Sequence, residues 1–432
     1  MSIFKPVEGR GILLQKLLTE ETHFEIGDSA TPLTSNSTGL GHPLFRKRVF
    51  TKGYVKNFLT MRRATIGYIS DAGEAGARQT LLATRLQYTA QAKTVLYAGN
   101  MSLSGNSPSD ISTALDAFSY YYNNLNLFPA YGNKDQDGVG GLDNMMDYFE
   151  PIASGRYRSI SINYDTPQVG DVSPVHVSFY HSGKNTAGDD TEPDGITAGS
   201  VQALALKAAA KASPAPWKIC VVHHPPVTGG EGALEELAHL LDGTWDLVLC
   251  GHSQVAEEID CKGKVRVLNV SSALTNEGSG ALTGAIEPGI VKLWSNDSVN
   301  GYVTIHANDK YLAWDIRDIV SNAIVRQSHL RKPSAKKIFT SSNNIRFYMT
   351  DEVTSAIVLS VNVDPVDLTE GAPIRELGIF ASSEAVATVA SGATTIPMDK
   401  IADYGHPILL EDGLALTHSS ANSKMITRVL SL

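Results

Sequence analysis

Residues 218–230 read KICVVHHPPVTGG, and this stretch sets the architecture that we expect for the surrounding chain. An apolar run long enough for one buried strand ends abruptly in two histidines, His223 and His224, followed by two prolines. The imidazoles are therefore expected at the rim of a sheet. In open α/β sheets, ligands bind at the carboxyl ends of the strands. The stretch thus predicts a polar site at such an edge.

Short apolar segments of the same kind recur on both sides of this stretch and alternate with helical patterns. The strand-like segments are residues 64–70, 93–99, 173–180, 217–222, 245–250 and 265–270, and the helical segments include residues 75–91 and 201–212. This alternation predicts an α/β domain whose strands are covered on both faces.

The composition limits the class of protein. The chain has 432 residues, and at roughly 150 residues per domain this length suggests two or three domains. With a net charge of −9 and no obvious basic face, nucleic acid is not an expected partner. The N-terminus lacks a signal-peptide pattern and no long apolar run occurs, so we expect a soluble protein made in a cytoplasm, without a membrane span. The three cysteines, Cys220, Cys250 and Cys261, read as small buried apolar residues.

Five of the predicted strand ends carry polar residues. They are residues 70–73 (SDAG), 99–100 (GN), 132–135 (GNKD), 223–224 (HH) and 251–254 (GHSQ). Because the carboxyl ends of parallel strands meet at one edge of a sheet, all five are expected to converge on one crevice.

In this order the five motifs resemble those of the calcineurin-like metallophosphoesterases, whose series is D-x-H, G-D-x-x-D, G-N-H-D/E, a lone His and G-H-x-H. Residues 194–230, a helix followed by WKICVVHHPP, are most similar to the purple acid phosphatase branch. The resemblance covers residues 65–306 and implies a four-layer α/β sandwich. It also implies two divalent cations joined by a bridging carboxylate, which generate a hydroxide nucleophile, and a histidine of the third motif that assists the leaving group.

The first two motifs depart from this pattern. Asp71 matches the first aspartate, but Gly73 stands where a histidine ligand is expected. Asn100 occupies the position of the bridging carboxylate, and Leu103 replaces the second acidic residue. A neutral amide offers one oxygen and cannot offset the charge of two metal ions.

The remaining motifs are also incomplete. Asn133 is retained as a ligand, whereas Lys134 takes the place of the assisting histidine, and its ammonium would repel a metal pair. His223 matches the lone histidine. His252 matches the first histidine of the last motif, and Gln254 replaces the second.

By resemblance, the candidate metal ligands are Asp71, Asn133, His223 and His252. The site that would use Asp71 keeps one good ligand, so we expect it to be empty. The other would draw on Asn100, Asn133, His223 and His252, a neutral set suited to a single cation such as zinc.

Alternatively, Lys134 replaces the missing metal charge and pairs with Asp71 or Asp135. Three interpretations remain open: an inert remnant without a cofactor, which we favour, a single-metal structural or binding site, and a working hydrolase. A fourth use of the crevice is ligand binding through Lys134 and His224.

The segments that flank the α/β block suggest a second domain. Residues 46–58 and 344–365 read as strands, residues 408–416 as a hairpin that turns at Asp412-Gly413, and residues 326–344 as a polar, basic linker. We therefore predict that residues 61–325 form a metallophosphoesterase-like domain inserted, through a linker at 326–343, between the halves 1–60 and 344–432 of a β-rich domain.

Joined together, these halves resemble tail-fibre or collar-type domains of phage particles, through the motif at residues 374–380 (IRELGIF). The resemblance implies a virion structural protein of the tail, baseplate or fibre that carries a catalytically silent domain. Its expected partners are other tail proteins and further copies of the same chain. A host cell surface is a further candidate partner. The alternative function is a single-metal phosphoesterase that acts on a host surface phosphoester.

Overall fold

The computed structural model describes residues 22–27, 43–49, 51–72, 76–101, 107–137, 140–152, 155–272, 280–340, 344–351 and 356–363, and strand segments between residues 373 and 431. Residues 62–335 form one compact unit, and residues 1–61 together with 336–432 form another. Within these described ranges, no helix is both long enough and apolar enough to cross a membrane.

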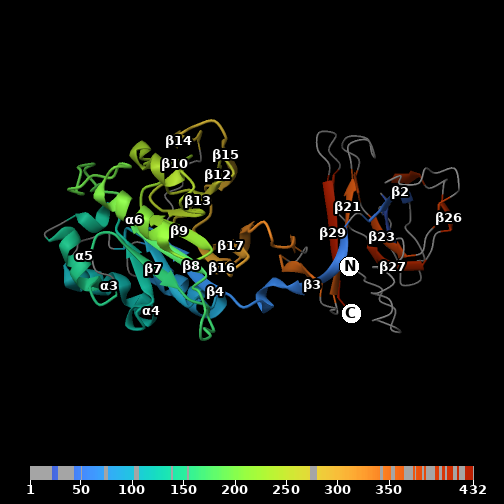
Figure 1. The fold of residues 1–432 in the computed structure, drawn as a ribbon, viewed down its shortest axis with the longest axis horizontal. Helices are drawn as coiled ribbons and strands as arrows, with labels where there is room; N and C mark the ends of the chain where they lie inside the picture. The colour runs from blue at the N-terminus through green and yellow to red at the C-terminus, as the bar shows by residue number, and fades with distance from the viewer. Residues whose placement is uncertain are drawn as a thin grey trace. The chain divides into compact units, whose positions relative to one another are not determined.

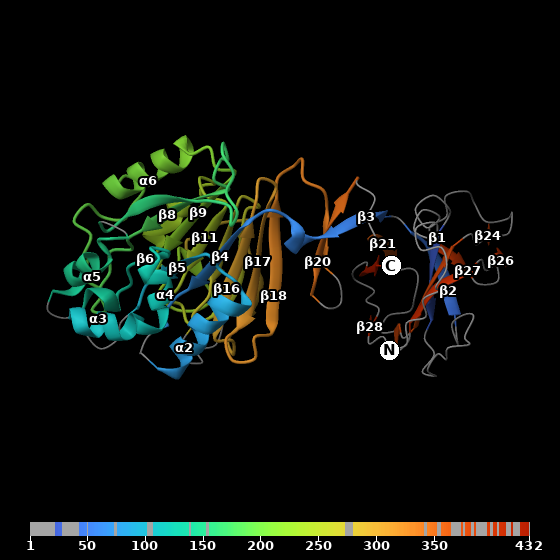
Figure 2. The same ribbon diagram turned by 90° about the horizontal axis from the view of Figure 1, so that it is seen from below.

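Two β-sheets form the centre of the unit of residues 62–335 (Figures 1 and 2). The first sheet has the order β18 (Ile324–Arg331), β17 (Tyr311–Asp318), β16 (Gly301–Ala307), β4 (Ala64–Ile69), β5 (Thr94–Ala98) and β6 (Leu127–Ala130). The second has the order β15 (Ile290–Asn296), β12 (Ala256–Cys261), β13 (Val265–Asn269), β11 (Leu247–Cys250), β9 (Trp217–Val222), β8 (Val175–Tyr180) and β7 (Arg158–Ile162). A short ribbon pairs β10 (Val227–Thr228) with β14 (Thr283–Gly284).

Helices cover the outer face of each sheet. The first sheet is covered by α2 (Ala77–Thr84), the π-helical turn η2 (Arg85–Thr89), α3 (Pro108–Leu115), η3 (Asp116–Phe118), α4 (Ser119–Asn123) and α5 (Gly141–Phe149). The second is covered by α6 (Val201–Ala212) and the 3₁₀ helix η5 (Glu235–Leu241). Figure 2 shows α6 on one side of the sheets and α2, α3 and α4 on the other. The unit is therefore a mixed α/β fold of four layers, as the sequence predicts.

The alternation of side chains along the buried strands explains these layers. In β4, Ile66 and Tyr68 pack into the core between the sheets, whereas Ile69 packs against the helices. In β9, Ile219 and Val221 face the same central core, whereas Cys220 packs with α6. Successive residues of a strand point to opposite faces, so strands buried on both sides read as continuous apolar runs.

The strand directions place the polar strand ends at one edge. The strands β4, β5 and β6 are parallel to one another, as are β8, β9, β11 and β13. The polar motifs follow the last residues of β4, β5, β6, β9 and β11, and a 3₁₀ turn, η4 (Lys134–Gln136), continues the third motif.

In the other unit, all described elements are strands except the turn η1 (Phe58–Thr60). One five-stranded sheet has the order β25 (Thr395–Pro397), β2 (Pro43–Arg48), β1 (Thr22–Gly27), β23 (Glu376–Ala381) and β27 (His406–Glu411). A second has the order β19 (Ile338–Thr340), β20 (Arg346–Thr350), β3 (Thr51–Asn57), β21 (Ala356–Val363) and β29 (Lys424–Ser431). Two short ribbons pair β22 (Pro373–Ile374) with β28 (Leu416–Thr417) and β24 (Glu384–Ala385) with β26 (Ile401–Asp403).

Two local predictions are corrected by this arrangement. The strand expected at residues 46–58 is divided between β2 and β3, which pair with different neighbours in different sheets. The expected hairpin at residues 408–416 does not form from its described strands, because β27 pairs with β23 and β28 with β22. Its turn at Asp412-Gly413 lies outside the described residues.

The linker predicted at residues 326–343 is also partly wrong. Residues 326–331 belong to β18, which pairs with β17 along its whole length. Arg326 Nε and Ser328 Oγ donate hydrogen bonds of 2.6 and 2.8 Å to the carboxylate of Glu258, which is fully buried and also bonded to Arg266. The basic side chain that suggested a solvated connection instead neutralises a buried acid on the facing sheet.

Candidate functional site

The carboxylate of Asp71 stands directly after β4 and is held by hydrogen bonds from three sides. Its Oδ2 accepts from Ser70 Oγ at 2.8 Å and from the backbone N–H of His252 at 2.9 Å, and its Oδ1 accepts from Asn100 Nδ2 at 2.8 Å. Asp71 is 9% exposed and has a φ of 48°. Burial raises the pKa of its carboxyl group, although the hydrogen bond from Ser70 and the neighbouring His252 oppose that shift. Both oxygens already serve as acceptors within the protein.

The amide of Asn100 has a fixed orientation. Its Oδ1 accepts from the backbone N–H of Lys134 at 3.0 Å, while its Nδ2 faces Asp71. A backbone N–H can only donate, so the atom facing Lys134 must be the oxygen, and the nitrogen must point to the carboxylate. At the position of the family's bridging carboxylate, this chain therefore has a hydrogen-bonded clamp between two loops.

Asp135, which is fully buried, joins the loop that follows β5 to the loop that follows β6. Its carboxylate accepts backbone N–H hydrogen bonds, each 2.8 Å long, from Asn100, Met101 and Gly132. Such bonds to a charged acceptor are among the stronger ones in proteins. These three hydrogen bonds are enough to explain why Asp135 is buried, so the predicted pairing with Lys134 is not required for it.

The imidazole of His223 is fully buried among the polar strand ends. Its Nδ1 donates to the carbonyl oxygen of Ala98 at 2.7 Å, which leaves Nε2 with a lone pair when the ring is neutral. That Nε2 lies 2.9 Å from Asn133 Oδ1 and 3.2 Å from His252 Nδ1. Burial, together with the nearby ammonium of Lys134, lowers the pKa of His223 to about 4, so the ring is neutral at pH 7.

His224 and His252 complete a cluster of three imidazoles. One ligand nitrogen of each of His223, His224 and His252 lies within 4.8 Å of the others. Burial and the neighbouring His223 lower the pKa of His252 to about 4, against the opposing effect of Asp71. Burial lowers the pKa of His224 strongly as well, and its Nδ1 bonds Ser182 Oγ at 2.7 Å. The three imidazoles are therefore neutral near pH 7, and their unprotonated nitrogens can act as metal ligands.

Lys134 and Gln254 are less buried than the three imidazoles' neighbours Asp71 and Asn133. Lys134 is exposed, and its charge helps to lower the pKa values of His223 and His252. Gln254 lies in the loop after β11 and has a φ of 54°, in the left-handed region. It stands at the position where the family pattern has its second histidine ligand. Gly73 and Leu103, the two other departures from the family pattern, lie outside the described residues.

Two glycines allow the loops to approach this closely. A Cβ atom on Gly132 would lie 2.5 Å from Asn100 N and from Asn100 Oδ1, and one on Gly99 would lie 2.6 Å from His223 Nδ1. Gly99 also has a φ of 83°, which other residues rarely adopt.

The donor set does not fit two metal ions. The oxygen of Asn100 is bonded to Lys134 N, and both oxygens of Asp71 accept hydrogen bonds, so no anionic oxygen is left to bridge two cations. One cation does fit the chemistry of the cluster, because Asn133 Oδ1 and His252 Nδ1 lie 2.9 and 3.2 Å from His223 Nε2, and all three atoms can offer a lone pair to the same ion. The hydrogen bond from His223 Nδ1 to the carbonyl oxygen of Ala98 would orient the ring, as such bonds from the nitrogen that does not bind the ion do in metal sites.

The structure therefore brings Asp71, Asn100, Asn133, His223 and His252 together. Hydrogen bonds join Asp71 to Asn100 and to the backbone of His252, and His223 Nε2 lies close to Asn133 Oδ1 and His252 Nδ1. Two further groups that the motifs did not indicate lie beside His224: Ser182, and the pair His181–Glu192. His181 Nδ1 lies 2.9 Å from Glu192 Oε2, and both side chains are almost completely buried. Ser182 follows the end of β8, and this position after a parallel strand is the feature of the sequence that could have predicted its place near the cluster.

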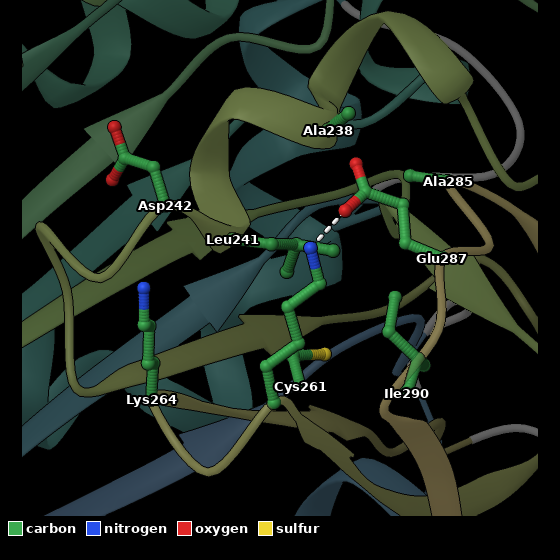
Figure 3. A pocket seen from close by; sticks show the side chains of 9 residues that line it. Ala238, Leu241, Asp242, Cys261, Lys264, Ala285, Glu287 and Ile290 are labelled. Atoms are coloured by element: carbon green, nitrogen blue, oxygen red, sulfur yellow. Dashed lines mark hydrogen bonds and ion pairs between the residues drawn. The ribbon is translucent and has the colours of Figure 1, made fainter.

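A separate cavity of 320 Å³ lies between η5 and the turn that joins β12 to β13. Its lining side chains are drawn in Figure 3. Three of its charged side chains form ion pairs: Lys262 with Glu287, and Asp242 with Lys207 at 2.8 Å. Burial raises the pKa of the Cys261 thiol that lines the cavity to about 12, so this thiol stays protonated and unreactive near neutral pH.

Several solved structures are similar to this chain. GAP50, the anchor in the inner membrane complex of Plasmodium, has a TM-score of 0.47 at 13% identity, over 63% of this chain and 89% of that one. Purple acid phosphatase PPD1 from yellow lupin seeds has a TM-score of 0.45 at 12% identity, over 66% of this chain and 56% of the enzyme. A dimetal phosphatase from Danio rerio has a TM-score of 0.38 at 12% identity, over 63% and 99%.

No curated protein matches the chain. Residues 64–256, which include all five polar strand ends, match the family model of the calcineurin-like phosphoesterases. The chain therefore contains a calcineurin-like phosphoesterase domain.

Proposed function

We propose that this chain is a structural protein whose phosphoesterase domain does not carry out two-metal hydrolysis. The observation that carries the proposal is the fixed amide of Asn100, which donates to Asp71 and accepts from Lys134 N. A bridging ligand must present negative charge to two cations, and this side chain presents an N–H toward the one carboxylate beside it. Lys134 adds positive charge at the rim, where a second cation would meet repulsion.

Hydrolysis of bis-p-nitrophenyl phosphate and p-nitrophenyl phosphate by the purified chain tests this proposal. The assays would contain Mn²⁺, Zn²⁺ or Fe³⁺ in turn. We expect rates equal to those of the metal ions alone. Metal-dependent turnover that disappears in His223→Ala but persists in His239→Ala, a substitution outside the cluster, would contradict the proposal.

A single-metal phosphoesterase is the second candidate, and the convergence of His223, His252 and Asn133 favours it. These three residues, with His224 beside them, would hold one divalent cation, which when bound would polarise a phosphoryl oxygen. Lys134 at the rim would attract the anionic substrate. Zinc titration and elemental analysis separate the two candidates: one equivalent of zinc per chain, lost in His223→Ala, is required by the second.

We further infer that the structural role is in a phage particle, with tail proteins and further copies of this chain as partners. Support comes from the sequence of the flanking segments, in which the motif at residues 374–380 spans β22 and β23. Mass spectrometry of purified particles should find the chain in a fixed ratio to other tail proteins. Recovery of the chain only from the soluble fraction of the host would overturn this assignment.

A further inference from the structure

A cleft of 340 Å³ opens at the end of the parallel strands opposite to the imidazole cluster. It is lined by residues at the starts of β5 and β6, by α4, and by β7 with the segment that follows it. Asn126 precedes β6, whereas Asn133 of the imidazole crevice follows the same strand. The cleft is therefore a separate site, and its volume lies at the lower end of the range for small-molecule clefts, roughly 300–1,000 Å³.

Aromatic side chains form the apolar part of this cleft. Tyr120 is 49% exposed and stands on the buried ring of Tyr121 in an edge-to-face contact with a centroid distance of 5.2 Å. Tyr121 is itself fixed by a hydrogen bond from its hydroxyl to the carbonyl oxygen of Ala92. Tyr164 is held by the guanidinium of Arg62, 4.2 Å from its ring centroid. Both rings are thus positioned before any ligand arrives.

Amide groups form the polar part. Asn124 Nδ2 donates to the carbonyl oxygen of Tyr120 at 2.6 Å, and Asn163 Oδ1 accepts from Ser173 Oγ at 2.5 Å. Each amide therefore keeps its other polar atom for a ligand. The side chain of Asn126 forms no hydrogen bond within the described part of the chain. Three amides with spare donors and acceptors can bond adjacent hydroxyl groups, which donate and accept at the same time.

The charges of the cleft select against ionic ligands. Lys93 supplies one ammonium group, and Asp165 supplies one carboxylate whose two oxygens already accept from Thr65 N and Thr65 Oγ1 at 2.8 and 2.6 Å. One cation beside one anion favours neither a phosphate nor a polyanion. A purely apolar ligand is disfavoured as well, because it would bury the spare amide atoms without partners.

We propose that this cleft binds a neutral saccharide of one or two residues. The ring of Tyr120 would cover the C–H face of a pyranose, and the amides of Asn126 and Asn163 would bond its hydroxyl groups. This site is independent of the metal chemistry of the imidazole cluster.

Isothermal titration of the full-length chain with maltose, cellobiose, lactose, N,N′-diacetylchitobiose and mannobiose tests the proposal. We expect saturable binding of at least one of them, weakened about tenfold by Tyr120→Ala and by Asn126→Ala. Tyr88→Ala is the matched control, because Tyr88 is 70% exposed and does not line the cleft. His223→Ala should leave the affinity unchanged, so a failure of the saccharide site and a failure of the proposed function give different results.

The proposal is overturned if none of the five saccharides binds. It is also overturned if binding survives both cleft substitutions, or if His223→Ala abolishes it. Tighter binding of inorganic phosphate or of an unrelated peptide than of every saccharide would equally reject the assignment of the ligand class.

Discussion

Replacing Asn100 by aspartate restores the carboxylate of the family pattern and, without metal ions, should make the protein sensitive to alkaline conditions. The substituted oxygen would replace Nδ2 at 2.8 Å from Asp71 Oδ1. Two unit charges at that separation repel by about 6 kcal/mol at an effective dielectric constant of 20. The folded variant relieves this repulsion by retaining a proton. Because the hydrogen bonds from Ser70 Oγ and from the backbone N–H of His252 to Asp71 offset part of the repulsion, the pKa of the carboxylate pair rises by about two to three units. A shift of that size corresponds to about 3–4 kcal/mol.

The direction of the pH dependence follows from this raised pKa. The folded variant binds a proton that the unfolded chain releases above its ordinary carboxyl pKa of about 4. Stability is therefore close to that of the parent at pH 4 and falls as the pH rises through the folded pKa, near pH 6–7. Urea unfolding in EDTA between pH 4.5 and pH 8, compared with the parent chain at each pH, measures the loss.

Two control variants isolate the charge effect. Asn100→Ala removes both amide hydrogen bonds and should destabilise the fold without the additional pH dependence. Combining Asn100→Asp with Asp71→Asn exchanges the two groups, so a single carboxylate remains and the pH dependence should return to that of the parent. If Asn100→Asp alone loses less than about 1 kcal/mol between pH 4.5 and pH 8, the clamp described here is wrong.

The remaining predictions concern the packing and charge that support the crevice. Gly132→Ala should lower the free energy of unfolding in urea by roughly 1–3 kcal/mol, because its Cβ would lie 2.5 Å from the backbone nitrogen of Asn100. Gly199→Ala is the control and should be neutral, because the space around Gly199 is open. Equal effects of the two substitutions would refute the close approach of the loops. Glu192→Ala should cost roughly 1–3 kcal/mol because it leaves the buried imidazole of His181 without its hydrogen-bond partner, and an unchanged melting temperature would contradict this. Glu258→Ala should cost roughly 3–5 kcal/mol by urea unfolding, since two guanidinium groups lose their buried acceptor; full stability at low and high salt alike would show that the network contributes nothing.

The convergence of the polar strand ends was predictable, because it depends on strand direction alone. Parallel strands such as β5 and β6 end at the same edge, so any residue that directly follows them, such as Asn100 or Asn133, lies near the others. The partner of each side chain was not predictable in this way. A one-residue change in a loop redirects an amide, and the bond from Lys134 N to Asn100 Oδ1 depends on a short turn whose geometry no motif specifies.

The pairing of the outer strands was likewise beyond sequence reasoning. The basic segment at residues 326–331 reads as a solvated linker, but a buried acid on the facing sheet, Glu258, gives its arginine a partner. Residues 46–58 read as one strand, yet β2 and β3 join different sheets. In both cases the decisive contact is made by a residue far away in the chain.

By itself, the sequence determined the α/β layering, the position of the polar edge and the loss of the bridging carboxylate, because each depends on local periodicity or on the identity of one side chain. Only the tertiary structure decided that Asn100 points its N–H to Asp71, that three neutral imidazoles form one cluster, and that a separate cleft opens at the opposite end of the strands. These depend on distances between residues from different strands, and such distances are fixed only when the two sheets pack against each other.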